Sequence, residues 1–225
     1  MNPEISWSIF LPPPDFNDKH ILATQDNNGF NAGMMFLRVH EWTISMLAEA
    51  IALPRLKPDI ELPFFDQSAI AYICNREGYQ EHFLYQPRRW WNRYHHDADG
   101  EEVGEMVIHF AGVSSVLKGS TTKIEFMTKF LERVERTPEA WTKNVKETKY
   151  EQEVEDYWNL LRRSRKALDK AREAQEQGKM SEAKEKLVEG KIQELIQVVL
   201  KWANDVDKVS EANKNLEVAL HRGQA

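Results

Sequence analysis

The sequence predicts an α/β fold over residues 1–120, followed by an α-helical tail over residues 121–225. Aromatic residues, proline and glycine concentrate before about Ser120, whereas Lys, Glu, Ala, Gln and Leu, which favour helices, dominate the remainder. A near-continuous apolar run from Met34 to Val39 is typical of a strand buried on both faces. In the last segment, apolar residues recur at steps of four and three, which indicates packed helices.

The charge and cysteine content narrow the class of protein. The formal net charge is -6, with acidic and basic residues mixed, so a phosphate-neutralising surface for nucleic acid is not expected. Cys74 is the single cysteine, which excludes an intrachain disulfide and a thiolate zinc cluster. No apolar run has the length to span a bilayer, and residues 1–14 do not resemble a signal peptide. The chain as written is therefore expected to carry no signal or anchor of its own.

A polar loop precedes the predicted strand. Gly29 and Gly33 can adopt backbone angles closed to other residues, and Asn31 between them can bond a ligand or its own backbone. A helix is expected to begin near Trp42, directly after the strand. Because α/β sheets present binding groups at strand ends, we expect this loop to line a site.

Two helices are predicted after this strand. The first begins near Trp42 and is ended by Pro54. The second stops near Gly78 and begins at Asp66, which is placed as its N-cap. Asp66 then has two interpretations. It is a cap alone, or it forms a pair with Gln67 that faces a cleft and bonds the hydroxyls of a sugar.

Arginine, tryptophan and aspartate crowd the next polar stretches. A short strand over His82–Tyr85 precedes interleaved Arg and Trp residues from Arg88 to Arg93. These residues either stack on and pair with an anionic ligand, or the tryptophans pack the loop against the core and the arginines are solvated. Asp97 and Asp99 form an Asp-x-Asp pattern, which suits a hard cation or a solvated turn.

A histidine follows the next predicted strand, which includes Met106 to Ile108. His109 ends this strand, and Gly112 three residues later lets the backbone come close to a ligand. This arrangement suits a metal ion or a diphosphate, whereas the alternative is a histidine that belongs to the core or the loop.

The tail has its own start and stop signals. Thr137 and Pro138 predict a helix start, and Gly178 followed by Ser181 predicts a stop and a new cap. A heptad seam runs from Val188 to Val209. We therefore expect a helical hairpin or coiled coil that turns near Gly178 and packs on itself or on a partner chain.

Four landmarks occur in order along the chain. They are Asn28-Gly29-Phe30-Asn31-Ala32-Gly33, Asp66-Gln67-Ser68-Ala69, Pro87-Arg88-Arg89-Trp90-Trp91-Asn92 and His109-Phe110-Ala111-Gly112. With these landmarks the chain resembles the fungal galactosyl/mannosyltransferase family, of the alpha-1,2-galactosyltransferase and mannan-polymerase-subunit type. The resemblance covers roughly residues 20 to 135 and corresponds to the carboxy-terminal half of such enzymes.

The resemblance implies a fold, an activity and a set of site residues. The fold is a partial Rossmann-like sheet of the GT-A-like type, and full-length members are expected at the Golgi membrane. The activity is transfer of a hexose from a nucleotide sugar to a glycan or glycoconjugate acceptor, with a manganese ion (Mn2+). The implied site consists of the catalytic pair Asp66 and Gln67, the substrate-binding residues Asn31, Gly33 and Gly112, and the metal ligand His109.

Two functional hypotheses follow. The first is a metal-dependent hexosyltransferase, in which electrostatic stabilisation of the leaving diphosphate supplies most of the catalysis. The second is a non-catalytic interaction protein that binds or self-associates through its helical hairpin, with the α/β part as support.

Overall fold

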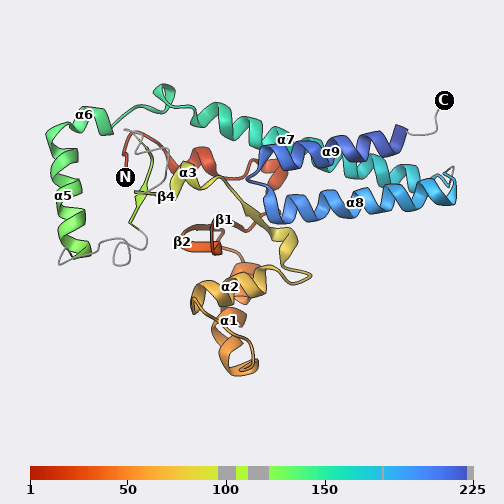
Figure 1. The fold of residues 1–225 in the computed structure, drawn as a ribbon, viewed down its shortest axis with the longest axis horizontal. Helices are drawn as coiled ribbons and strands as arrows, with labels where there is room; N and C mark the ends of the chain where they lie inside the picture. Colours follow the sequence, from red (N-terminus) through yellow and green to blue (C-terminus); the bar gives the residue numbers. More distant parts are fainter. Residues whose placement is uncertain (96–104, 111–121, 179, 222–225) are drawn as a thin grey trace.

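A small mixed sheet lies at the centre of the computed structural model, which describes residues 1–95, 105–110, 122–178 and 180–221 (Figure 1). The strand order is β2-β1-β3, and β1 pairs antiparallel with β2 and parallel with β3. A second, two-stranded parallel sheet pairs β4 with β5. The strands are β1 (Ile21–Asp26), β2 (Gly29–Leu37), β3 (Phe83–Tyr85), β4 (Arg93–Tyr94) and β5 (Ile108–His109).

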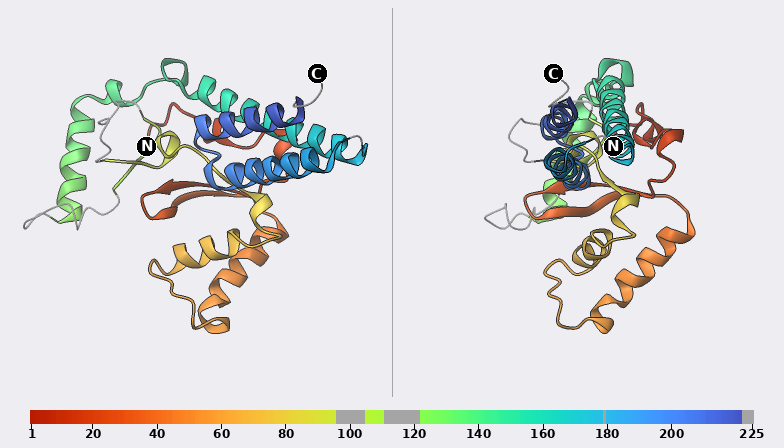
Figure 2. Two further views of the ribbon diagram at one scale, coloured as in Figure 1. Left: turned by 45° about the vertical axis from the view of Figure 1, so that its right-hand side comes forward. Right: turned by 90° about the vertical axis from the view of Figure 1, so that its right-hand side faces the viewer.

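Helices cover both faces of the three-stranded sheet (Figures 1 and 2). Along β1, Ile21 and Ala23 belong to the core formed with α1 and α2, whereas Leu22 belongs to the core formed with the amino-terminal segment, α3 and α7. This alternation follows from the two-residue period of a strand, and it buries both faces. The elements that flank β1 to β3 are η1 (Trp7–Phe10), η2 (Pro14–Phe16), α1 (Glu41–Leu56), α2 (Asp66–Cys74), η3 (Gln80–His82) and α3 (Arg88–Trp91).

The tail contains a three-helix bundle. The elements of the tail are α5 (Lys123–Arg136), α6 (Pro138–Trp141), η4 (Val145–Glu147), α7 (Tyr150–Glu176), α8 (Glu182–Trp202) and α9 (Val206–His221). The last three of these helices form the bundle. The predicted turn is confirmed: Gly178 has φ 61°, and the Ser181 hydroxyl accepts the Lys184 N–H. The predicted continuous seam was wrong beyond Trp202, because the chain reverses there and α9 packs back on α7 and α8. None of the helices in the described ranges is long and apolar enough to cross a membrane.

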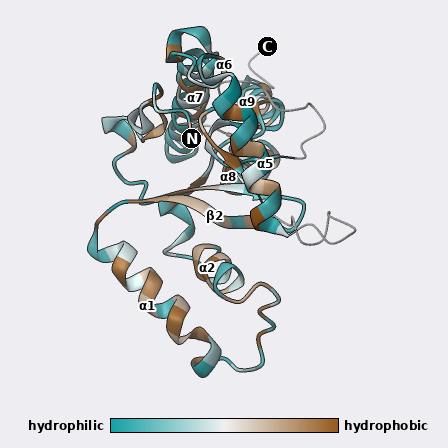
Figure 3. Ribbon diagram, turned by 90° about the vertical axis from the view of Figure 1, so that its left-hand side faces the viewer, coloured by the Kyte–Doolittle hydropathy of each residue, from teal (hydrophilic) through white to brown (hydrophobic). Residues whose placement is uncertain are grey.

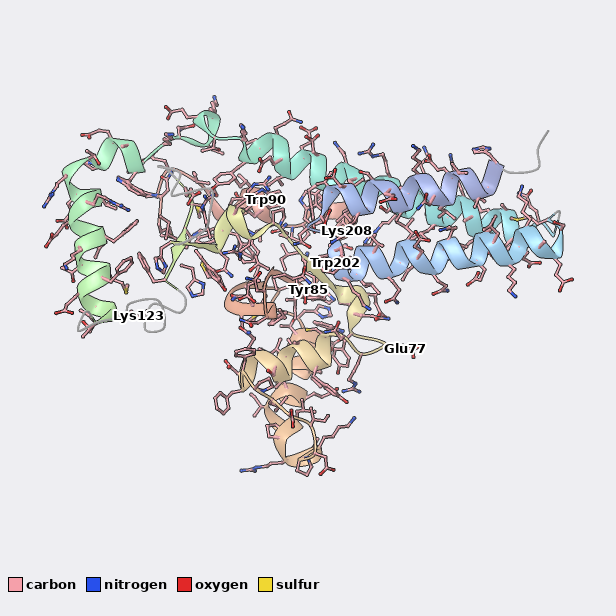
Figure 4. The ribbon with its side chains drawn as sticks, viewed as in Figure 1. Glu77, Tyr85, Trp90, Lys123, Trp202 and Lys208 are labelled. Atoms are coloured by element: carbon pink, nitrogen blue, oxygen red, sulfur yellow. The ribbon has the colours of Figure 1, made fainter. Side chains whose placement is uncertain are left out.

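The bundle is joined to the sheet rather than held apart by a linker. The Tyr157 hydroxyl donates to the Tyr85 carbonyl at 2.9 Å, and the Trp90 indole donates to Glu153 at 2.8 Å. Figure 4 shows Tyr85, Trp90 and Trp202 in the region where the bundle meets the sheet. One apolar core therefore contains side chains from both ends of the chain.

Several local predictions need correction. β2 is only partly buried rather than buried on both faces, since Phe30 and Asn31 alone among its residues are buried. The N-cap of α2 is Phe65, and Asp66 is the first helical residue, without a side-chain capping bond to the described residues. Pro54 lies inside α1, which continues to Leu56, since a proline near a helix end removes few backbone bonds. The strand predicted from Met106 is only the two residues of β5.

Candidate functional site

A network of buried polar side chains joins the β1–β2 hairpin to the β4–β5 sheet. Asn31 on β2 is 5% exposed, and Asn92, which follows α3, is fully buried. The Asn92 amide donates to Thr24 on β1 at 2.7 Å and to the Asn31 side-chain oxygen at 2.9 Å. Residues that are 61 positions apart in the sequence thus share one buried hydrogen-bond network.

The side chain of Asn31 is fully occupied within this network. Its Nδ2 donates to Asp26 at 2.8 Å and to the Tyr94 hydroxyl at 2.5 Å. Its Oδ1 accepts from the Gly33 N–H and from Asn92, both at 2.9 Å. An amide side chain has two donors and two acceptor lone pairs, so Asn31 acts as a framework residue in this arrangement.

Asn92 also fixes the state of His109. The Nδ1 of His109 lies 2.7 Å from the Asn92 side-chain oxygen. An amide oxygen only accepts, so Nδ1 must carry the proton and donate it. In the neutral ring the lone pair is then on Nε2, which becomes the nitrogen available to a ligand.

Gly33 is needed for space rather than for its backbone angles. Gly29 has φ 95° at the hairpin turn, as the sequence predicts, whereas Gly33 does not have a positive φ. A Cβ atom built on Gly33 would lie 2.2 Å from His109 Cε1 and 2.8 Å from Nδ1. The His109 ring therefore lies directly against the backbone of β2, a contact that only glycine permits.

The surroundings of His109 lower its pKa and so favour the neutral form of its ring. Partial burial lowers the pKa of His109 below its usual 6.5, and the positive charges of Lys123 and Arg88 lower this pKa further. The Asp26 carboxylate acts in the opposite direction. Arg88 stacks over the Tyr94 ring at 4.1 Å, and Tyr94 packs edge-on against His109 with ring centroids 5.3 Å apart.

The predicted Asp-Gln pair divides between two places. The Gln67 side-chain oxygen accepts the Ala32 N–H at 3.0 Å, next to Gly33. Asp66 instead lines an apolar cavity between α1 and α2. Gly112, Asp97 and Asp99 lie outside the described residues.

Both tryptophans of the Arg-Trp segment are buried, as one of its two interpretations predicts. Trp90 and Trp91 are at most 1% exposed, and Arg89 pairs with Glu153 at 2.9 Å. Sequence reasoning did not select Asn92, Thr24 or Tyr94 as site residues. The signal for Asn92 was its place directly after two tryptophans that anchor it in the core.

His109 has the form of a metal-binding histidine, but the described residues do not complete a metal site. Histidine ligands typically donate their other ring N–H to a fixed acceptor, as His109 does to Asn92. Among the described residues, no group of three or more His, Cys, Asp or Glu side chains could hold a metal ion. The described residues therefore supply one candidate ligand, His109, rather than a complete metal site.

Comparison with known proteins shows that this region of the chain is similar to glycosyltransferases. Residues 14–118 match the galactosyl transferase GMA12/MNN10 family. An alpha-1,2-galactosyltransferase of Schizosaccharomyces pombe is 29% identical over 104 residues, which are 44% of this chain and 26% of that protein. The chain thus spans about a quarter of the length of this relative. No solved structure matches the chain significantly.

Proposed function

We propose that this chain supplies the sugar-side part of a hexosyltransferase site, which transfers a hexose from a nucleotide sugar to a glycan or glycoconjugate acceptor. The observation that carries this proposal is the convergence of Asn31, Gly33 and His109, which come from two different sheets. Gln67 contacts the same stretch of β2. The family match covers the segment that contains all four residues.

The electrostatics of the site suit an anionic donor. Lys123 and Arg88 are close enough to His109 for their positive charges to lower its pKa. Positive charge around a neutral imidazole favours a diphosphate group, because it attracts the phosphates without requiring the ring to be charged. In this proposal Asn31 and Asn92 hold the ring, and His109 Nε2 faces the ligand.

The proposed role of His109 is to give one ligand to a divalent cation such as Mn2+. Its fixed tautomer leaves Nε2 as a neutral donor nitrogen, which suits a transition metal. The remaining ligands would come from outside the described residues. When bound, such a cation would neutralise charge on the leaving diphosphate.

The sheet is consistent with a proposed GT-A-like, Rossmann-like arrangement. β1 and β3 are parallel neighbours, and the chain between them forms β2, α1 and α2. A crossover through helices between parallel strands is the unit from which such folds are built. Full-length proteins with this function are proposed to act at the Golgi membrane.

The alternative function, binding through the tail, has a weaker basis in the structure. The seam residues Val188, Ile192, Leu195 and Val209 are each at most 3% exposed, inside the chain's own bundle. A partner helix would therefore need a different surface of the bundle.

The proposed function is tested by titrating the chain with Mn2+ and with a panel of nucleotide sugars, using isothermal titration calorimetry. The same titrations are made with His109→Ala and with His221→Ala, a control at the end of α9. We expect Mn2+-dependent binding of at least one nucleotide sugar, which His109→Ala weakens about tenfold or more and His221→Ala leaves unchanged.

Thermal unfolding of both variants shows whether they are folded. Identical titrations of the parent chain and a folded His109→Ala variant would contradict the assignment of His109. Failure of every nucleotide sugar to bind would contradict the proposed function of this chain.

A further inference from the structure

A cavity of about 490 Å³ lies between α1, α2 and the chain that connects them. Ile51 and Pro54 of α1 form one wall, and Ile70 of α2 forms the opposite wall. Phe65 and Asp66 lie where the connecting chain enters α2. α1 and α2 lie together on one side of the three-stranded sheet (Figure 1), and no lining residue of this cavity belongs to the polar network.

The lining indicates the class of ligand. Apart from Asp66, the described residues of the lining are aliphatic, proline or aromatic. The volume is within the range of small-molecule sites, which are mostly apolar with a few polar groups that orient the ligand. Such a cavity suits a hydrocarbon chain whose polar head donates a hydrogen bond to the Asp66 carboxylate.

Large apolar side chains are exposed at this cavity. Ile51 is 81% exposed and Phe65 is 82% exposed, although both line it. Phe65 also has φ 46°, a left-handed conformation that is unfavourable for a bulky residue. Strained residues of this kind concentrate at ligand sites, and a bound hydrocarbon chain would remove the exposed surface from water. Figure 3 shows hydrophobic segments on both α1 and α2.

The first turn of α2 connects this cavity to the candidate site. Asp66 lines the cavity, and its neighbour Gln67 bonds the backbone of Ala32. Ala32 is followed by Gly33, against which the His109 ring packs. The first turn of α2 thus joins the head end of the cavity to the stretch of β2 against which His109 packs.

We propose that the cavity between α1 and α2 binds the apolar aglycone of a glycoside acceptor, with the glycoside head at Asp66. This proposal rests on the proposed function for the role of the glycoside as acceptor. Binding of the apolar chain itself depends only on the cavity, and it is measured separately.

The test is a series of alkyl glucosides with one head group and chains of one, four, six and eight carbons, titrated below their micelle concentrations. Burial of each methylene group is expected to raise the affinity about fourfold until the cavity is filled. Ile51→Glu places a charge at the cavity and is expected to weaken octyl glucoside binding about tenfold or more. Ile44→Glu is the matched control, because Ile44 is 66% exposed on the same helix but does not line the cavity. Asp66→Asn is expected to weaken binding of all chain lengths by a similar factor.

Affinity that does not change with chain length would overturn the proposal. Equal loss of octyl glucoside binding in Ile51→Glu and Ile44→Glu would do the same. Sedimentation that shows a dimer dissociated by Ile51→Glu would make the cavity an interface between two copies, and would also overturn it. Nucleotide-sugar titration of the Ile51→Glu variant distinguishes failure of this proposal from failure of the proposed function. The proposed function depends on His109, so the variant should still bind the nucleotide sugar even if it no longer binds octyl glucoside.

Discussion

The helical bundle and the polar network stabilise the chain in opposite ways. In the bundle, apolar side chains such as Leu195 and Leu216 are fully buried among residues of the same kind. In the network, buried amides such as Asn31 and Asn92 are stabilised because each group has a hydrogen-bond partner. The bundle therefore tolerates changes that keep apolar volume, whereas the network depends on the identity of each atom.

This difference explains which region is suited to binding. An apolar core lowers the free energy of the folded chain without presenting a reactive group to a ligand. The network holds a histidine ring in one tautomer and leaves Nε2 for a ligand. Substitutions in the bundle should therefore change mainly the stability of the chain, whereas substitutions in the polar network should also change the environment of His109.

The largest effect is expected from Leu195→Ala. Leu195 is fully buried between the bundle helices, and removal of a buried leucine side chain costs about 3 kcal/mol. Urea denaturation measures the free energy of unfolding, and Val218→Ala is the control because Val218 is 44% exposed on α9. A loss below about 1 kcal/mol for Leu195→Ala would show that the bundle is not packed as described. Ligand binding should be unchanged under conditions where the variant is folded.

A pH-dependent effect of intermediate size is expected from His20. Burial is the main cause that lowers the pKa of His20 from 6.5 to about 4, and the neighbouring His40 and His82 lower it further. Arg38 also lowers this pKa, whereas Asp18 raises it. The His20 ring stacks on those of His40 and His82, with centroids 4.2 and 4.9 Å away.

Because the folded pKa lies below the unfolded one, the unfolded chain binds more protons, and stability falls as the pH drops from 6.5 towards 4. His20 should therefore contribute a loss of about 2 kcal/mol between pH 7.5 and pH 5. Urea denaturation at these two pH values, with His20→Gln as the comparison, measures this loss. An equal pH dependence in both proteins would exclude His20 as its source.

The smallest effect on stability, but a specific one, is expected from Gly33→Ala. The new methyl group would overlap the His109 ring, so the ring must move at a cost of about 1–2 kcal/mol. Gly190→Ala on α8 is the matched control, because a methyl group there meets no described atom within 4 Å and should stabilise the helix by up to about 1 kcal/mol. Thermal unfolding should shift in opposite directions for the two variants, and a shift in the same direction would exclude the close contact of Gly33 with His109.

The bundle could be predicted from the sequence to a large extent. Local signals such as Gly178 and the Ser181 cap act within a few residues, so the sequence alone predicts them. The end of α8 at Trp202 could not be predicted, because the apolar period continues into α9 although the chain reverses direction between the two helices.

The network was predictable only in part. The resemblance selected Asn31, Gly33 and His109, and the structure brings them together. Asn92 ends one of the four landmarks, but the landmark gives it no role, because that role arises from contacts with residues 61 and 17 positions away. The close approach at Gly33 is likewise a tertiary property, which a glycine alone does not reveal.

Asn92 holds the proton of the neutral His109 ring on Nδ1, and this tautomer can be observed directly. Two-bond proton–nitrogen correlation spectra of 15N-labelled chain at neutral pH report the tautomer of each histidine. The structure predicts that His109 has the Nδ1–H tautomer in the parent chain and reverts mainly to the Nε2–H tautomer in Asn92→Ala. An Nε2–H tautomer of His109 in the parent chain would show that Asn92 does not accept a hydrogen bond from Nδ1.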